Sequence, residues 1–178
     1  VSGPTVFLLD SGNYNGMLFN KIIQGSSISN TITFRSASSN PNDVVFSSST
    51  NPLMLENAAY LNFENITFDG RNVETTVYLA GNCNDIVIDS CMIYASTSTT
   101  TSTYRCIYQE SGGVLKNIRI ANSYISGGCY GIYLYAQSTA CNENIIINNN
   151  TLLHQYNYAI YSYYTEFESI GNNLMKPR

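Results

Sequence analysis

A short phrase that recurs along the chain constrains its fold more than any other feature. It is a five-residue strand of period two with two large apolar residues on one side. Its four full copies, at residues 65–69, 85–89, 117–121 and 144–148, open their apolar pairs with Ile66, Ile86, Ile118 and Ile145, so the intervals are 20, 32 and 27 residues. An earlier copy occupies 31–35, and a decayed copy ends at Asn172. Hairpins need tight two-residue turns, which are few here, so the intervals predict successive turns of a solenoid.

A second phrase gives the same period independently. It is an apolar–Tyr–X triplet at residues 77–79, 107–109, 132–134 and 160–162, with intervals of 30, 25 and 28 residues. The two phrases alternate in strict order, which defines a coil with at least two strands. Stacked coils would pair each strand with its copy ~4.8 Å away in a parallel sheet. We therefore predict an all-β parallel β-helix of about six coils, nearly without helix, in which the four opening isoleucines are buried and stacked.

The composition supports this fold class and excludes other functions. Asn, Ser and Thr fill roughly a third of the chain, and their short polar side chains compete for backbone hydrogen bonds and so disfavour helix. Charged residues make up only 11%, against ~25% in ordinary globular domains. A net charge of −4 with scattered basic residues argues against nucleic-acid binding. No apolar run reaches the ~18 residues of a membrane span, so we expect no membrane insertion.

The tight turns after the first phrase carry asparagine at 122, 149 and 172. Stacked amides at these positions could form a hydrogen-bonded ladder. Alternatively, asparagine simply tolerates the left-handed backbone of a tight turn. Both explanations could hold together.

Five cysteines at 83, 91, 106, 129 and 141 suit an oxidising compartment, and their odd number leaves at least one unpaired or paired elsewhere. Cys106 and Cys129 both precede the second phrase on consecutive coils, so we expect them to lie closest together. There is no CxxC motif, and the single histidine, His154, cannot complete a zinc site. We interpret His154 as a turn residue and expect neither metal nor cofactor.

The length fits one domain over residues 1–178, a segment of a longer protein if the chain has been trimmed before Val1. Residues 1–58 form less regular N-terminal coils, and residues 59–178 form regular coils. The uncharged Ser/Thr-rich stretch 95–103 is interpreted as a protruding loop between coils.

Three segments carry a resemblance to a known group of proteins. They are Gly3-Pro4-Thr5-Val6 with Ser11-Gly12-Asn13-Tyr14, residues 30–45, and residues 60–70. The chain resembles the right-handed parallel β-helix regions of large secreted and surface proteins of gliding bacteria that use the type IX export route. The resemblance implies the pectate-lyase-like superfold and an extracellular or bacterial cell-surface location. Such regions occur in adhesins, in polysaccharide lyases and in proteins of no known activity, so the superfold does not give the function.

The strongest candidate surface follows from the alternation in the second phrase. If the apolar residues of that phrase point inward, one tyrosine per coil points outward, and a second column lies two residues along. The expected binding surface comprises Tyr78, Tyr108, Tyr133, Tyr161, Tyr135 and Tyr163. Aromatic rings stack on the apolar faces of sugars, and phenols hydrogen-bond sugar hydroxyls. The alternative is that stacked rings only stabilise neighbouring strands.

A second candidate is a pair of acids with a nearby base. Asp69 and Asp89 hold the same place in successive copies of the first phrase, and Arg119 faces outward near them. Such a cluster could serve glycoside hydrolysis or a lyase of this superfold. Against this, Asp69 precedes a glycine in a routine turn pairing, and the next copies carry Ala121 and Asn148 instead of acids. No sequence feature establishes an enzyme.

Two main functional hypotheses follow from these features, and a third, an ice-binding solenoid, is weak because only residues 31–33 supply the Thr-X-Thr pattern that it needs on many coils. The first is a non-enzymatic surface module for adhesion or polysaccharide binding, whose partner is a polysaccharide or cell-surface glycan, with its ends free to stack on further coils or other chains. The second is a pectate-lyase-like polysaccharide lyase or glycoside hydrolase. An enzyme would show a groove lined by several acids and a base, whereas a binding module would show the tyrosine strip without that cluster.

Overall fold

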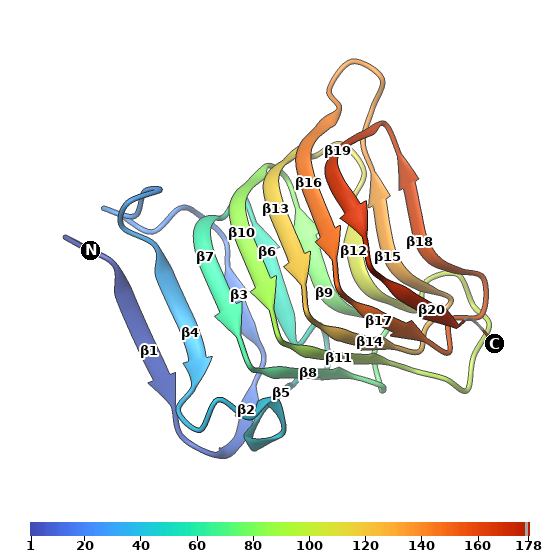
Figure 1. The fold of residues 1–178 in the computed structure, drawn as a ribbon, viewed down its shortest axis with the longest axis horizontal. Coiled ribbons are helices and arrows are strands. Elements are labelled where there is room, and N and C mark those ends of the chain that lie inside the picture. Colours follow the sequence, from blue (N-terminus) through green and yellow to red (C-terminus); the bar gives the residue numbers. More distant parts are fainter. Residues whose placement is uncertain (177) are drawn as a thin grey trace.

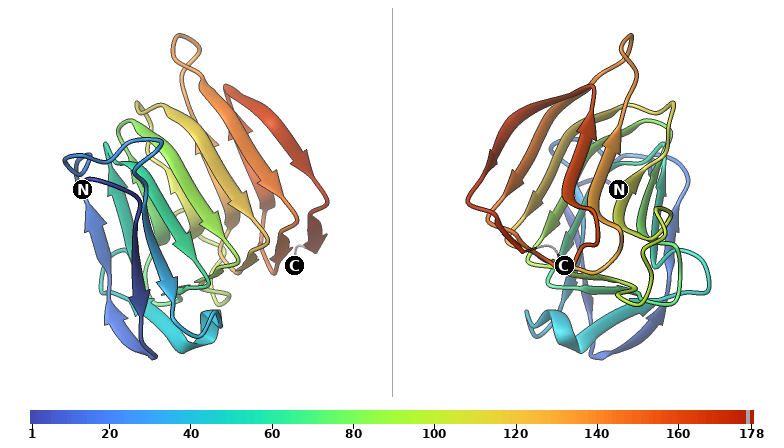
Figure 2. Two further views of the ribbon diagram at one scale, coloured as in Figure 1. Left: turned by 60° about the vertical axis from the view of Figure 1, so that its left-hand side comes forward. Right: turned by 90° about the vertical axis from the view of Figure 1, so that its right-hand side faces the viewer.

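Both phrases form strands of a β-solenoid of about six turns. The computed structural model describes residues 1–176 and 178. Each sheet is parallel, and its neighbouring strands come from successive turns, so strand numbers along a sheet rise by three. Figure 1 shows the strands side by side, with the two chain ends at opposite ends of the stack, and Figure 2 shows the same order from two other directions. The predicted all-β parallel solenoid is confirmed.

Three sheets run along the solenoid. The first contains β1 (Thr5–Leu9), β4 (Ile32–Ser36), β7 (Ala59–Glu64), β10 (Cys83–Asp89), β13 (Leu115–Ala121), β16 (Asn142–Asn148) and β19 (Thr165–Gly171). The second contains β2 (Gly12–Asn15), β5 (Val44–Ser47), β8 (Thr67–Gly70), β11 (Met92–Ala95), β14 (Tyr124–Ser126), β17 (Thr151–Leu153) and β20 (Leu174–Lys176). The third contains β3 (Met17–Phe19), β6 (Leu53–Glu56), β9 (Thr75–Ala80), β12 (Arg105–Gln109), β15 (Tyr130–Tyr135) and β18 (Tyr158–Tyr163).

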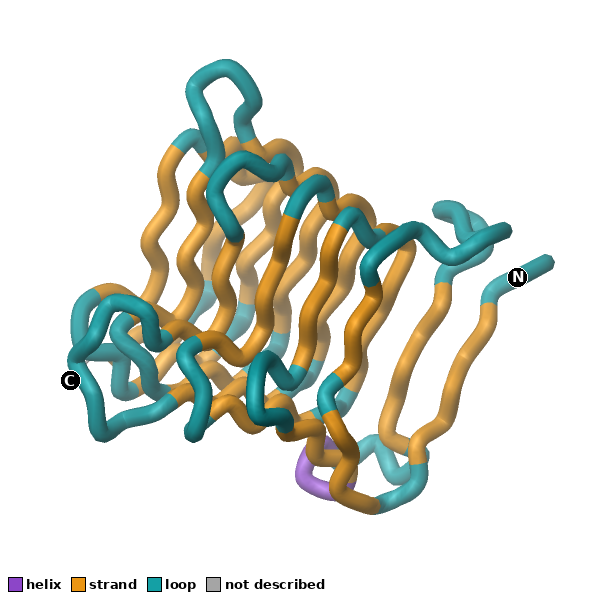
Figure 3. The backbone as a smooth tube through the Cα atoms, turned by 180° about the vertical axis from the view of Figure 1, so that it is seen from behind, coloured by secondary structure: helices purple, strands orange, loops and turns teal. Residues whose placement is uncertain are grey.

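Helix is nearly absent, as predicted. Within residues 1–176 and 178, the one helical element is the short 3-10 helix η1 (Pro41–Asp43), whose first turn is capped by the Asn40 side chain. Figure 3 shows it at a corner of the solenoid, between the strands. No helix in this part of the chain has the length and apolar character needed to cross a membrane.

The core consists of apolar columns that run from turn to turn inside the three sheets. In the first sheet, for example, Phe63, Ile88, Ile120 and Ile147 are paired in register and wholly buried. Phe7 and Ile170 lie at the two ends of this column and are about half exposed, at 47% and 49%. Burial therefore depends on having a turn on both sides, as expected for a solenoid.

The predicted stack of four isoleucines is correct for three of them. Ile86, Ile118 and Ile145 are paired in register along the first sheet. Ile66 is also buried, but it lies at the corner between β7 and β8, and the partner of Ile86 on that side is Leu61. The copy at 65–69 therefore leads into the second sheet, and the prediction was wrong at Ile66.

The corners between the first and second sheets explain the asparagines. Asn122, Asn149 and Asn172 have φ values of 52°, 58° and 54°, so the left-handed turn interpretation is confirmed. A hydrogen-bonded column of asparagine side chains lies one residue further on and faces inward. Asn150 and Asn173 Oδ1 accept bonds from the backbone N–H groups of Ser123 and Asn150. Asn150 is 1% exposed, so these bonds satisfy buried backbone donors that would otherwise be costly.

Cys106 and Cys129, the two cysteines expected to lie closest together, form no disulfide, and all five cysteines are free. Arg105 pairs with Tyr130, so Cys129 lies beside Tyr104 and its N–H donates to the Tyr104 carbonyl at 2.7 Å. The Cys106 thiol donates instead to the carbonyls of Ser126 and Gly127. Burial raises the pKa of the Cys106 thiol to about 12, which keeps it in the unreactive protonated form.

Two loops interrupt the regular coils. Residues 96–104, which hold most of the Ser/Thr-rich stretch, connect β11 to β12 within one turn, so the prediction of a loop between coils was wrong in its place. Residues 136–141 connect β15 to β16 and project beyond the ends of the strands, which Figure 1 shows as the orange loop at the top.

Candidate functional site

The tyrosines of the second phrase occupy one position on four successive strands of the third sheet. Tyr78, Tyr108, Tyr133 and Tyr161 are paired in register through β9, β12, β15 and β18. The flanking Val77, Ile107 and Ile132 are wholly buried, so the tyrosine side chains lie on the outer face. The predicted outward column is present. We call this surface, with the neighbouring tyrosines described below, the tyrosine face.

The rings of this column pack against one another. The ring centroids of Tyr78 and Tyr108 are 5.5 Å apart, and those of Tyr108 and Tyr133 are 5.6 Å apart, at interplanar angles of 61° and 55°. Tyr133 and Tyr161 stack at 4.8 Å and 18°, so each covers one side of the other ring. The tyrosine face therefore offers ring edges and phenol groups as well as ring faces.

A second outward column is also present, as predicted. Tyr135 and Tyr163 pair in register, and their rings stack at 5.4 Å and 17°. Tyr163 is 45% exposed, which makes its ring one of the more accessible parts of the face.

A third outward column of tyrosines was not predicted from the sequence. Tyr130 and Tyr158 pair in register with ring centroids 6.0 Å apart, and both rings also contact the Tyr133–Tyr161 pair. Strict alternation assigns residues three apart to opposite faces, so these tyrosines were not expected on the outer face. The missed signal is the repeat Tyr-Gly-Ile-Tyr at 130–133 and Tyr-Ala-Ile-Tyr at 158–161, in which a small residue follows the first tyrosine.

Arg105 occupies the Tyr130 position one turn earlier. Its guanidinium lies 4.0 Å from the Tyr108 ring centroid and 4.8 Å from that of Tyr133, which are cation–π distances. This stacking fixes the rings at the middle of the tyrosine face. Burial, followed by neighbouring tyrosines, raises the pKa of Tyr133 despite the opposing charge of Arg105, so its phenol stays protonated.

Tyr78 ends the column next to a hollow in the surface. Its hydroxyl donates a 2.7 Å hydrogen bond to Glu110, and burial together with this bond raises the pKa of Tyr78. The hollow has a volume of about 430 Å³, and its lining includes Asn72, Glu74 and Tyr104 in addition to Tyr78. It lies where the loops before β6, β9 and β12 meet at the edge of the third sheet.

The predicted acidic pair is not formed. Asp69 pairs with Tyr94 in the second sheet, whereas Asp89 pairs with Glu64 and Ala121 in the first sheet. The prediction of stacked acids was wrong because it rested on the misplaced copy at 65–69. Asp69 instead binds Arg71, whose Nε donates to Asp69 Oδ1 at 2.8 Å.

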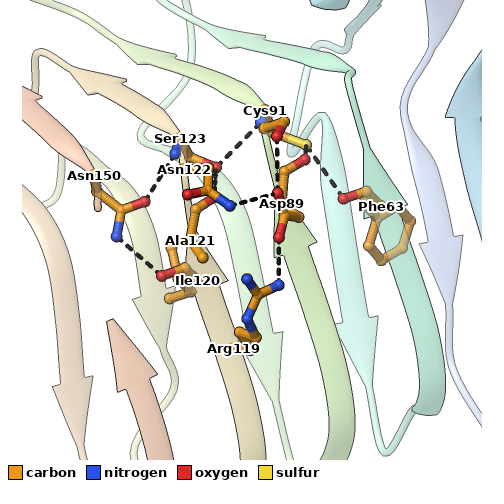
Figure 4. A network of polar contacts seen from close by, with 10 residues as sticks. Phe63, Asp89, Cys91, Arg119, Ile120, Ala121, Asn122, Ser123 and Asn150 are labelled. Carbon is orange, nitrogen blue, oxygen red and sulfur yellow. Dashed lines mark hydrogen bonds and ion pairs between the residues drawn. The ribbon is translucent and has the colours of Figure 1, made fainter. Parts of the chain in front are cut away.

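Arg119 does lie beside Asp89, as expected. Figure 4 shows Arg119 and Asn122 directed at this carboxylate, and the two carboxylate oxygens accept bonds from them. Burial raises the pKa of Asp89, but the bonds from Asn122, Ser90 and Arg119 outweigh it, so the pKa lies below its usual value. The Asp89 carboxylate is thus ionised and held in place, and it has no second acid from the Asp69 position.

His154 is an exposed residue in the turn after β17, with a φ of 65°, as its interpretation as a turn residue predicts. The described residues contain no group of three or more His, Cys, Asp or Glu side chains placed to hold a metal ion. The tyrosine face and its adjoining hollow are therefore the best-defined candidate site.

Comparison of the chain with protein-family models, curated proteins and solved structures found no match. The function has to be argued from the site itself.

Proposed function

We propose that the protein is an extracellular β-solenoid module that binds a polysaccharide along its tyrosine face. The observation that carries the proposal is the register of four tyrosines, Tyr78, Tyr108, Tyr133 and Tyr161, on successive turns of the third sheet. A column of this kind repeats one chemical group at the ~4.8 Å spacing of strands. A polymer with its own short repeat can meet such a column at several points.

The chemistry of the face suits sugars. Each tyrosine supplies an apolar ring and a polar hydroxyl, which match the apolar faces and the hydroxyl groups of a sugar ring. The neighbours of these rings are other tyrosines and Arg105, so the side chains are already ordered before a ligand arrives. Ordering in advance lowers the entropy lost on binding.

The extracellular location is part of the proposal. The low fraction of charged residues and the abundance of uncharged polar residues support it, as does the resemblance to secreted and surface β-helix regions. The enzyme hypothesis lacks a comparable argument, since the two acids that would have formed its centre lie on different sheets.

The double variant Tyr108→Ala/Tyr133→Ala tests this function on a glycan array. We expect the double variant to bind none of the glycans that the unchanged protein binds on the array, because the two substitutions remove the middle of the tyrosine column. The fold should persist, since the inward Ile107 and Ile132 still fill the core. Circular dichroism checks the fold.

The chain offers a matched control for this experiment. Tyr94 and Tyr124 are half-buried tyrosines of the second sheet with ring centroids 5.9 Å apart. Tyr94→Ala/Tyr124→Ala removes the same number of rings from another sheet, and glycan binding should survive. Equal binding by both double variants would contradict the proposed site.

A further inference from the structure

The hollow beside Tyr78 has the features of a subsite for one sugar residue. Tyr78 and Tyr104 contribute aromatic rings to it, and Val73, which is 8% exposed, contributes apolar surface. The rest of the lining is polar, with hydroxyl, amide and carboxylate groups. Aromatic and apolar surface combined with a few polar groups is the usual make-up of a small-molecule site.

The loops that form the hollow are held by hydrogen bonds. The Asn51 amide donates to the Thr75 carbonyl at 2.8 Å, which joins the loop before β6 to the start of β9. The Arg105 N–H donates to the Glu74 carbonyl at 2.8 Å, and this bond joins the loop before β9 to the start of β12. The hollow is therefore formed by three consecutive turns whose relative positions are fixed, and it does not depend on a ligand to take shape.

The charge of the lining selects among sugars. Glu74 is the one ionisable acid among the described residues that line the hollow, and none of those residues is a lysine or arginine. A uronic acid or sulfated sugar placed there would meet the Glu74 carboxylate, and no described lysine or arginine lines the hollow to offset that charge. A neutral sugar can use the same carboxylate, the amides and the hydroxyls as hydrogen-bond partners.

We infer that the hollow binds a neutral sugar residue at the end of the polymer segment that lies along the tyrosine face. Tyr78 belongs to both surfaces, so the polymer passes from the column into the hollow without a gap. The inference rests on the proposed function, and it adds where one sugar residue of the polymer binds and that this sugar is uncharged. It implies that the protein prefers neutral polysaccharides to acidic ones, because the one guanidinium described on the tyrosine face, that of Arg105, is already stacked on the rings of Tyr108 and Tyr133.

The test is calorimetric titration with neutral hexasaccharides of glucan, xylan and mannan and with hexagalacturonate. We expect at least one neutral hexasaccharide to bind the unchanged protein more tightly than hexagalacturonate. Asn72→Trp places a large side chain in the hollow from an exposed loop position and should weaken neutral binding by about tenfold or more, the effect of losing ~1.4 kcal/mol of contacts. Glu74→Gln should raise the affinity for hexagalacturonate.

Ser138→Trp is the matched control. Ser138 is exposed in the loop that follows β15, whereas the hollow lies at the ends where the strands of the third sheet begin, so this substitution should not affect binding. If neutral sugars bind and Tyr108→Ala/Tyr133→Ala abolishes binding while Asn72→Trp does not weaken it, the subsite is overturned and the tyrosine face stands. Tighter binding of hexagalacturonate by the unchanged protein also overturns the subsite. If no glycan binds on the array or in the calorimeter, both proposals fail.

Discussion

Asp89 illustrates how an outward side chain of the solenoid is fixed by residues from other turns. Its carboxylate accepts bonds from Arg119 and Asn122, which belong to the next turn, and from its neighbour Ser90 at 2.8 Å. Asp69, in contrast, is held by Arg71 two residues away. Both carboxyls have pKa values below their usual range, Asp69 chiefly through the Arg71 bond and Asp89 through bonds that outweigh burial.

Replacement of Arg119 tests the contribution of the inter-turn contact. A lowered pKa in the folded state means that ionised Asp89 stabilises the fold above about pH 4, and that this contribution is lost as the pH falls through the folded pKa. Arg119→Gln should raise the pKa of Asp89 toward its usual value. The variant should therefore be less stable than the unchanged protein at pH 7, with a difference that narrows below about pH 4.

The measurements are the carboxyl titration of Asp89 by NMR and the urea midpoint as a function of pH. Arg71→Gln is the control, because it removes the partner of Asp69 and should leave the titration of Asp89 unchanged. An Asp89 pKa that does not move in Arg119→Gln would show that the amide and hydroxyl bonds suffice.

At the scale of single strands, much of the architecture was predictable. The apolar–Tyr–X triplet placed four strands of the third sheet in correct register, because an inward apolar residue next to an outward tyrosine is tied to one face. The Asn-Ile pair was ambiguous, because Asn65 at the corner before β8 and Asn117 inside β13 have the same φ of 53° and are both followed by a buried isoleucine. The Asn-Ile pair marks a residue with left-handed backbone followed by a residue whose side chain points into the core, and this combination occurs at two places in each turn.

The candidate site was predictable to a similar extent. The two tyrosine columns follow from alternation, but Tyr130 and Tyr158 required knowledge of a local departure from it. The hollow beside Tyr78 could not be predicted, because its loops vary in length from turn to turn and come together only through the stacking of three turns.

The left-handed corners give a prediction for a single element. Asn149 has a φ of 58° at the corner between β16 and β17, and its N–H donates to the Gly171 carbonyl of the next turn. A residue with a β-carbon but no local hydrogen-bonding group is disfavoured in this conformation by about 1 kcal/mol. Asn149→Ala should therefore lower the free energy of unfolding by about that amount, as measured by urea denaturation.

Asn149→Gly separates backbone conformation from other effects of losing the amide. Glycine adopts positive φ freely, so this variant should be clearly more stable than Asn149→Ala. If the glycine variant were as unstable as the alanine variant, the asparagine side chain itself would be responsible.

At the scale of the whole molecule, stability depends on position along the solenoid axis. A turn in the middle buries its core residues against a turn on each side, whereas the first and last turns that the structure describes have a neighbouring turn on one side only. The column Ile120, Ile147 and Ile170 shows the gradient directly, with exposures of 0%, 0% and 49% for side chains of the same type in register. Folding energy in such a stack is approximately a sum of turn and interface terms.

This gradient predicts unequal costs for the same substitution. Ile120→Ala opens a cavity in the middle of the core and should lower the free energy of unfolding by about 2–5 kcal/mol. Ile170→Ala removes the same atoms from a half-exposed side chain with no turn beyond it in the structure, so its cost should be below about 1 kcal/mol.

Urea denaturation of the two variants gives the difference in the free energy of unfolding, and amide hydrogen exchange shows where in the solenoid this difference arises. In Ile170→Ala the faster exchange should be confined to β18, β19 and β20, while in Ile120→Ala it should extend through β10, β13 and β16. Equal costs for the two substitutions would mean that the last turn is as well packed in solution as the middle ones, which requires another surface to cover it.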